Sequence, residues 1–258
     1  MTFRDSAWPD GTPCWADVMA PDRKQAIEFY SALFGWDFVE GPEETGFYCI
    51  ASLDGHRVAG VGGIPPGQEG WPAVWTTYLA VSDIDKTTEA VTEAGGQVLA
   101  PPMDVMTEGR MAIAADPAGA VFGLWQAGDH SGMQAANIPG AVTWNEGMSH
   151  DFEAAKAFYA KVFGYGFDDM SGPGFSYATL TVGGNVVGGL GTLPEATPAE
   201  VPPHWSTYFA VADTDAAVAK LVELGGTVLT PAFDSPHGRV GIVADNQGVA
   251  FRVIAQKG

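Results

Sequence analysis

Residues able to do chemistry occur in two matching sets, one in each half of the chain. Each set holds a carboxylate, a hydroxyl group, a tyrosine, tryptophan and arginine. The first set comprises Trp15, Asp17, Thr76, Tyr78, Arg110 and Trp125, and the second comprises Trp144, Glu146, Ser206, Tyr208, Arg239 and Arg252. Because residues i and i+2 of a strand share a face, we expect each set to line one surface.

Acid/base catalysis within these sets would fall to the carboxylates and tyrosines. A carboxyl group in an apolar cleft tends toward a raised pKa, which suits a general base near neutrality. We therefore predict Asp17 and Glu146 as bases, with Tyr78 and Tyr208 as proton donors. The other members would suit an aromatic or planar ligand with a polar edge, because rings stack and arginine donates directional hydrogen bonds. Ligand-binding roles are predicted for Trp15, Thr76, Arg110, Trp125, Trp144, Ser206, Arg239 and Arg252.

A purely structural interpretation of the same residues stays open, since duplication preserves packing as readily as chemistry. Asp17 could pair with Arg110, because buried charges are usually paired. Glu146 could likewise pair with Arg252 or Arg239. The two tyrosines could be framework residues whose hydroxyls tie down a strand.

The sets recur because the second half of the chain repeats the first. The segment 75–83 (WTTYLAVSD) returns as 205–213 (WSTYFAVAD), and Phe29-Tyr30 returns as Phe158-Tyr159. Solenoid repeats are about 20–50 residues long, so a repeat of about 130 residues is a duplicated domain. We predict domains at 10–127 and 141–256, joined by a polar linker at 128–140.

Each half divides again into two units that read strand, helix and further strands. In the first unit Asp22 can cap a helix, Ala26, Phe29 and Tyr30 share its apolar face, and Gly35 ends it. The pattern predicts an α+β fold made of four βαβββ modules. The helices would cover one face of a sheet and leave the other to line a cleft. Unit one could pair with unit two or with unit four.

Composition narrows the class of protein. The 258 residues carry a net charge of −19, with 46% hydrophobic and 17% charged residues. Such a chain is globular, and nucleic acid and anionic membranes would repel it. A signal peptide and an apolar transmembrane run are both missing from the sequence, so we expect a cytoplasmic protein. Cys14 and Cys49 become Thr143 and Ala178 in the second copy, which favours buried free thiols over a duplicated disulfide.

Three patterns carry a family resemblance: Asp22 with Phe29-Tyr30 and Phe34-Gly35, Asp83 with Gly95-Gly96, and the turn 116–119 (DPAG), each with a counterpart in the second half. With these the chain resembles the vicinal-oxygen-chelate superfamily of glyoxalases, extradiol dioxygenases and bleomycin-resistance proteins. It is most similar to tandem proteins commonly labelled "putative hydroxylases". The resemblance implies two tandem glyoxalase-like domains with curved mixed sheets enclosing clefts.

The resemblance also implies a divalent metal held by side chains of the first and last strands. The matching positions here are Trp15, Trp144, Thr76, Ser206, Gly123 and Arg252. Transition metals need imidazole, thiolate or carboxylate ligands, which these residues do not supply. The five histidines do not pair at ligand spacing, and we expect them at the surface. They are His56, His130, His150, His204 and His237. We therefore predict no metal and no other cofactor.

These observations favour a glyoxalase- or bleomycin-resistance-like protein that binds a small organic molecule, with or without metal-independent catalysis. One alternative is a metal-dependent glyoxalase, lyase or hydroxylase/dioxygenase-type enzyme of the same superfamily. Another is an interaction protein with vestigial clefts. Single-domain relatives usually dimerise, and the tandem copies would supply that contact internally, so both a monomer and a homodimer are compatible with the sequence.

Overall fold

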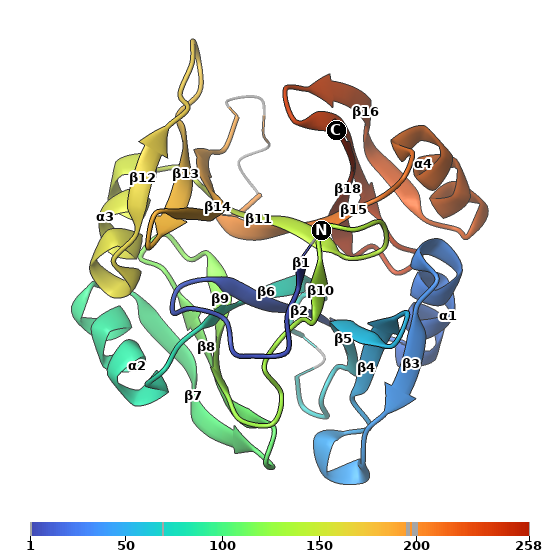
Figure 1. Ribbon diagram of the computed structural model, residues 1–258, viewed down its shortest axis with the longest axis horizontal. Coiled ribbons are helices and arrows are strands. Elements are labelled where there is room, and N and C mark those ends of the chain that lie inside the picture. Colours follow the sequence, from blue (N-terminus) through green and yellow to red (C-terminus); the bar gives the residue numbers. More distant parts are fainter. Residues whose placement is uncertain (1, 69, 195–196, 198–200, 258) are drawn as a thin grey trace.

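The computed structural model describes residues 2–68, 70–194, 197 and 201–257. Over these residues the chain forms four α-helices and two curved eight-stranded mixed sheets, plus a small two-stranded sheet (Figure 1). The predicted α+β class and the two tandem domains are confirmed.

The first domain contains one eight-stranded sheet in the order β3-β4-β5-β2-β6-β9-β8-β7. Its first unit consists of β2 (Pro13–Ala20), α1 (Arg23–Phe34), β3 (Asp37–Glu40), β4 (Cys49–Leu53) and β5 (His56–Gly63). Its second unit consists of β6 (Trp75–Ala80), α2 (Ile84–Glu93), β7 (Gln97–Val105), β8 (Gly109–Ala115) and β9 (Val121–Ala127). Antiparallel pairing of β2 with β6 joins unit one to unit two.

The second domain repeats this order as β12-β13-β14-β11-β15-β18-β17-β16. Unit three consists of β11 (Val142–Ser149), α3 (Phe152–Phe163), β12 (Gly166–Asp169), β13 (Tyr177–Val182) and β14 (Asn185–Thr192). Unit four consists of β15 (His204–Ala210), α4 (Thr214–Glu223), β16 (Thr227–Ser235), β17 (Gly238–Ala244) and β18 (Ala250–Gln256).

The helices begin where the sequence predicts. The Asp22 carboxylate accepts hydrogen bonds from the backbone N–H groups of Lys24 and Gln25, and Gly35 ends α1 with φ of 75°. Asp83, Asp151 and Asp213 cap the other three helices in the same way.

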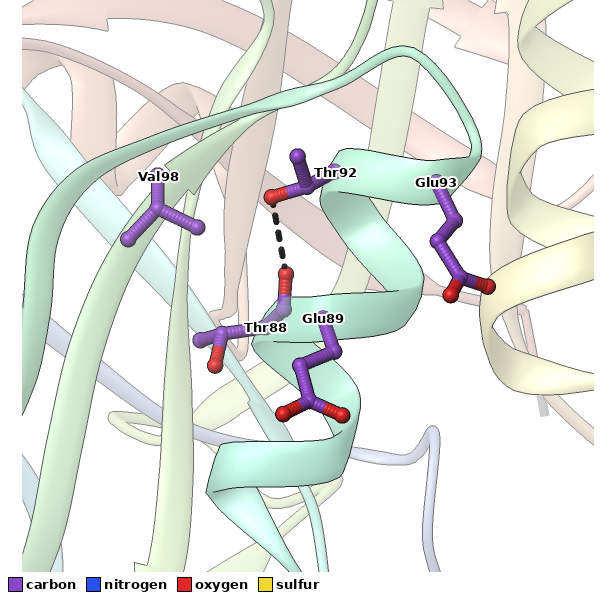
Figure 2. Close-up of a pocket in the computed structure, with 5 residues that line it drawn as sticks. All are labelled: Thr88, Glu89, Thr92, Glu93 and Val98. Atoms are coloured by element: carbon purple, nitrogen blue, oxygen red, sulfur yellow. Dashed lines mark hydrogen bonds between the residues drawn. The ribbon is translucent and has the colours of Figure 1, made fainter.

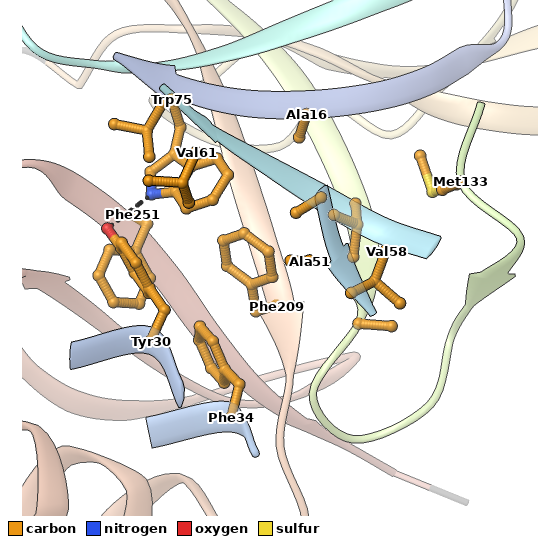
Figure 3. Packing of buried hydrophobic residues seen from close by; sticks show 14 of the residues in the cluster. Ala16, Tyr30, Phe34, Ala51, Val58, Val61, Trp75, Met133, Phe209 and Phe251 are labelled. Carbon is orange, nitrogen blue, oxygen red and sulfur yellow. Dashed lines mark hydrogen bonds between the residues drawn. The ribbon is translucent and has the colours of Figure 1, made fainter. Parts of the chain in front are cut away.

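The helices of the two domains pack against each other in pairs, α1 with α4 and α2 with α3 (Figure 1). Each apolar core therefore draws on both domains. One core lies mainly between units one and four, where Tyr30 and Phe34 contact Phe251 and Phe209, and Trp75 of unit two also packs against Phe209 (Figure 3). The other joins units two and three around Phe122, Phe158 and Tyr159.

The repeated Phe-Tyr pair has a structural role at this interface. The Tyr30 hydroxyl donates to Asp245 of the second domain at 2.9 Å, and the Tyr159 hydroxyl donates to Asp116 of the first at 3.3 Å. Both aspartates lie in the turn before the last strand of their domain. A tyrosine of α1 or α3 therefore binds the final hairpin of the opposite domain.

The segment predicted as a linker packs on the first domain. The N–H of Met133 donates to the carbonyl of Cys14 at 2.7 Å, and β10 (Ala135–Ala136) pairs with β1 (Thr2–Phe3) near the centre of Figure 1. Cys14 and Cys49 are buried free thiols, as predicted. Within the described ranges, every helix is too short or too polar to span a membrane.

Candidate functional site

Four side chains form what we call the first cluster: Trp15, Asp17, Tyr48 and Tyr78. The sequence predicted all of them except Tyr48. They lie on the face of the first sheet opposite its helices. Asp17 Oδ2 accepts hydrogen bonds from the hydroxyls of Tyr48 at 3.0 Å and Tyr78 at 3.1 Å. The indole N–H of Trp15 donates to the Tyr48 hydroxyl at 3.0 Å. Hydrogen bonds from Trp15 through Tyr48, and from Tyr78 directly, thus converge on one carboxylate oxygen of Asp17.

The environment of Asp17 perturbs its acidity. The residue is 3% exposed, and among the described residues its Oδ1 has no hydrogen-bond partner. Burial raises the pKa of Asp17 to about 7, against the lowering effect of the two tyrosine hydrogen bonds. Burial and the nearby carboxylate also raise the pKa values of Tyr48 and Tyr78, so both hydroxyls stay protonated as donors.

The second cluster repeats this arrangement with one addition, and consists of Trp144, Glu146, Tyr177, Tyr208 and Arg252. The Tyr177 hydroxyl donates to Glu146 Oε2 at 2.9 Å and accepts from the Trp144 indole at 3.0 Å. Glu146 Oε1 accepts from the Tyr208 hydroxyl at 2.7 Å and from Nη1 of Arg252. Here both carboxylate oxygens are engaged, and the charge is paired.

Glycines make room for the tyrosine rings. A Cβ on Gly60 would overlap the Tyr48 hydroxyl, and one on Gly189 would overlap that of Tyr177. Gly123 lies beneath the Tyr78 ring in the same way. Its counterpart in the second domain is Arg252, whose guanidinium lies 4.9 Å from the centroid of the Tyr208 ring. This exchange of glycine for arginine is the main chemical difference between the clusters.

The clusters also differ in how far they are covered. In the first, Trp15 and Tyr78 are each 4% exposed, and the Trp15 ring meets His130 edge-on at 4.3 Å between centroids. In the second, Trp144, Tyr177 and Tyr208 are only half-buried. Solvent therefore reaches the second cluster more readily than the first.

His130 does not lie at the surface as expected. It is 6% exposed because it packs between Trp15 and Trp125, and its carbonyl accepts from the Trp125 indole at 2.8 Å. Burial lowers the pKa of His130 to about 4. The prediction failed because the polar sequence around His130 gave no sign that the segment folds back over the first sheet.

The other arginines lie elsewhere. Arg110 pairs with Asp85 and Asp104 rather than with Asp17. Arg239 pairs with Asp215 and Asp234, which leaves Arg252 as the partner of Glu146. Thr76 and Ser206 are half-buried and stand opposite Asp17 and Glu146 in the strand register.

Sequence reasoning missed Tyr48 and Tyr177, which complete the carboxylate contacts. A signal was present, because the two tyrosines are equivalent positions of the duplicated domains. Strand alternation relates residues of one strand, whereas Tyr48 precedes β4 and Tyr177 begins β13, each two strands away from the carboxylate that it contacts.

Two surface hollows lie outside the two clusters. One, of about 380 Å³, lies between α2 and β7 and is lined by Thr88, Glu89, Thr92, Glu93 and Val98 (Figure 2). It has two acidic side chains and none of the predicted site residues. The other, of about 250 Å³, is lined partly by Trp8, Cys14 and Trp125 near the first cluster. The contacts of the clusters, rather than these hollows, define the candidate site.

A divalent transition metal would need imidazole, thiolate or carboxylate ligands that converge on one point. Across the described residues, no three His, Cys, Asp or Glu side chains gather as a metal site would require. Trp15 and Trp144 use their indole N–H groups as hydrogen-bond donors, and an indole N–H cannot ligate a cation. The described side chains do not fit a divalent transition metal.

Comparison with known proteins places the chain in a family. The model of the "Glyoxalase/Bleomycin resistance protein/Dioxygenase superfamily" matches residues 15–124 and 148–253. "Putative glyoxylase CFP32" of Mycobacterium tuberculosis is 40% identical over 254 residues, covering 96% of both chains. "Anthracycline biosynthesis protein DnrV" of Streptomyces peucetius is 38% identical, covering 95% of this chain and 93% of that protein.

Solved structures agree on the fold. The Mn(II)-bound glyoxalase from Novosphingobium aromaticivorans has a TM-score of 0.66 at 15% identity, over 95% of this chain and 82% of that one. The 2,3-dioxygenase LapB from Pseudomonas sp. KL28 has a TM-score of 0.67 at 12% identity, over 99% and 94%. Matches in both halves, at this identity and coverage, establish that the chain belongs to the glyoxalase/bleomycin resistance protein/dioxygenase superfamily.

Proposed function

We propose that this protein binds a small planar organic molecule against the helix-free face of its sheets, and that it does so without the metal centre of its superfamily. The observation that carries the proposal is the tryptophan–tyrosine–carboxylate chain found in both domains. Trp15 and Trp144 stand where the family resemblance implies a metal ligand, and each is committed to a hydrogen bond with a tyrosine.

The ring-rich composition of both clusters supports a planar ligand. Each cluster offers one tryptophan and two tyrosines around a single carboxylate, and aromatic faces favour stacked or edge-on contact with another ring. The name of the Streptomyces relative connects that protein with anthracycline biosynthesis. Anthracyclines are built on fused rings, which is the ligand shape that we infer for the present chain.

If the protein also catalyses a reaction, proton transfer is the chemistry that these residues can supply. Asp17 has one oxygen without a partner in the described chain, and its pKa near 7 suits both uptake and release of a proton. Glu146 is less suited, because Arg252 and two tyrosines already engage both of its oxygens. We therefore assign any acid/base step to Asp17.

We also infer that a single chain is sufficient for this function. The two domains share both apolar cores. Each domain therefore already makes, within one chain, the apolar contact that a single-domain protein would make with a second copy. Light scattering of the purified protein should give the mass of a monomer.

The proposal is tested by combining metal analysis with a ligand screen. Protein purified without added metal should contain no stoichiometric iron, zinc or manganese by elemental analysis. A thermal-shift screen of planar aromatic compounds should raise the melting temperature, because a ligand that binds only the folded state stabilises it. A stoichiometric ion inside the protein would favour a metal-dependent enzyme instead, and a screen without any binder would contradict the binding role.

A further inference from the structure

The second cluster contains a cationic group whose binding capacity is only partly used. Arg252 is 17% exposed and donates from Nη1 to Glu146 and to the Tyr208 hydroxyl. Within the described chain, its Nε and Nη2 make no hydrogen bond. Burial by itself would lower the pKa of Arg252, but the charge of Glu146 together with the contacts to Tyr208 raises it overall, so the guanidinium is always charged.

The orientation of this guanidinium is held from two sides. Glu146 fixes one edge, and the Tyr208 ring supports one face at 4.9 Å. A planar guanidinium presents its N–H groups as a rigid fork that matches the two oxygens of a carboxylate. Because the guanidinium is already oriented, the Arg252 side chain would lose little conformational freedom when an acidic ligand binds.

His204, which we expected at the surface from the sequence, extends this polar area. His204, Ser206 and Tyr208 alternate along β15, so their side chains share one face of the sheet. His204 is half-buried and interacts electrostatically with Arg252 and Glu146. Burial, followed by the charge of Arg252, lowers its pKa and keeps the ring neutral at pH 7.

The tautomer of His204 follows from its partner. Its Nδ1 lies 2.8 Å from the carbonyl oxygen of Pro202, and a carbonyl can only accept a hydrogen bond. Nδ1 therefore carries the proton, and Nε2 of the neutral ring is an acceptor. The first domain has neither group, since Val74 and Gly123 occupy the equivalent positions.

We propose that the second domain is a recognition site for a planar organic acid, with Arg252 binding the acid group and His204 Nε2 accepting a hydrogen bond from a hydroxyl of the ligand. This inference rests on the proposed function and adds the charge and the anchoring groups of a ligand held by the second domain. The half-buried rings of Trp144, Tyr177 and Tyr208 would contact the flat part of the molecule.

Isothermal titration calorimetry with three related probes tests the inference: naphthoate, its neutral amide naphthamide, and hydroxynaphthoate. Wild-type protein should bind naphthoate at least about tenfold more tightly than naphthamide, since hydrogen bonds to charged groups are the stronger ones. Arg252→Gln should abolish this preference. His204→Val, which installs the first-domain residue, should remove the additional affinity of hydroxynaphthoate, about fivefold for one hydrogen bond.

Arg23→Gln is the matched control, because Arg23 is 18% exposed and paired with Glu40 outside the second cluster. It should leave all three affinities unchanged. If Arg252→Gln does not fold by circular dichroism, Arg252→Lys decides, and it should retain only part of the preference because lysine lacks the fork. Equal binding of naphthoate and naphthamide would overturn the inference and leave the proposed function intact, whereas binding of neither probe would contradict both.

Discussion

Replacing Asp17 with asparagine should remove a large part of the pH dependence of this protein's stability. Burial raises the pKa of Asp17 from 3.8 in the unfolded chain to about 7 in the folded protein. The folded protein therefore keeps a proton that the unfolded chain has already released. By linkage, the resulting stabilisation is complete below pH 3.8 and is lost as the pH rises through about 7.

The magnitude follows from the difference between the two pKa values. About three pH units correspond to about 4 kcal/mol, at 1.36 kcal/mol for each unit. The isoelectric point near 4.3 limits solubility at the acid end of this range. From about pH 5 to about pH 8 the expected loss is about 3 kcal/mol, a large fraction of the 5–15 kcal/mol that is typical of a folded domain.

Urea unfolding of the two proteins across this pH range gives the measurement. The free energy of unfolding of Asp17→Asn minus that of wild type should grow by about 3 kcal/mol as the pH rises. Asparagine preserves the shape of the carboxyl group and accepts the same two tyrosine hydrogen bonds, so packing changes little. Asp37→Asn, at an exposed position of β3, should stay parallel to wild type. A constant difference for Asp17→Asn would show that Asp17 is ionised throughout and would refute the reasoning.

Three further substitutions probe the framework of the site. Tyr30→Phe removes a buried hydroxyl that bonds across the domain interface, and should lower the free energy of unfolding by about 1–3 kcal/mol in urea; an unchanged midpoint would argue against that bond. Gly189→Ala should displace the Tyr177 ring and weaken ligand binding in calorimetry, whereas Gly63→Ala, whose added Cβ would have 4.0 Å of clearance, should behave as wild type; equal effects of the two would be inconsistent with the packing. His130→Gln should protect against acid, because the stability linked to the lowered pKa is present above pH 6.5 and lost as the pH falls through about 4. Wild type should lose about 2 kcal/mol relative to this variant between about pH 7 and pH 5, and identical pH profiles would exclude a buried neutral His130.

Much of the fold could be predicted because its signals are local. A capping aspartate, an apolar helical face and a glycine stop involve residues only a few positions apart, as in the helix from Arg23 to Phe34. Internal repetition then extended each local pattern to four modules. The pairing of modules was left open because both candidate arrangements bury the same strand faces.

The candidate site was less predictable, because its contacts join distant strands. The carboxylates Asp17 and Glu146 were named, but Tyr48 and Tyr177 reach them from the start of β4 and β13, each separated from the carboxylate's strand by another strand of the sheet. Three arginines could have paired with the two acids by type alone. Only Arg252 does so, because it lies on the strand next to Tyr208 and on the same face.

The sequence alone determined the duplicated modules, the helix ends, the free thiols and the residue types at each position of the family pattern, since these depend on neighbouring residues or on identity. The tertiary structure decided that units one and two share a sheet, that both cores lie between the domains, and that His130 is buried over the first cluster. The physical reason is that hydrogen bonds and ion pairs act over a few ångströms, and which groups come that close is set by how the whole chain packs.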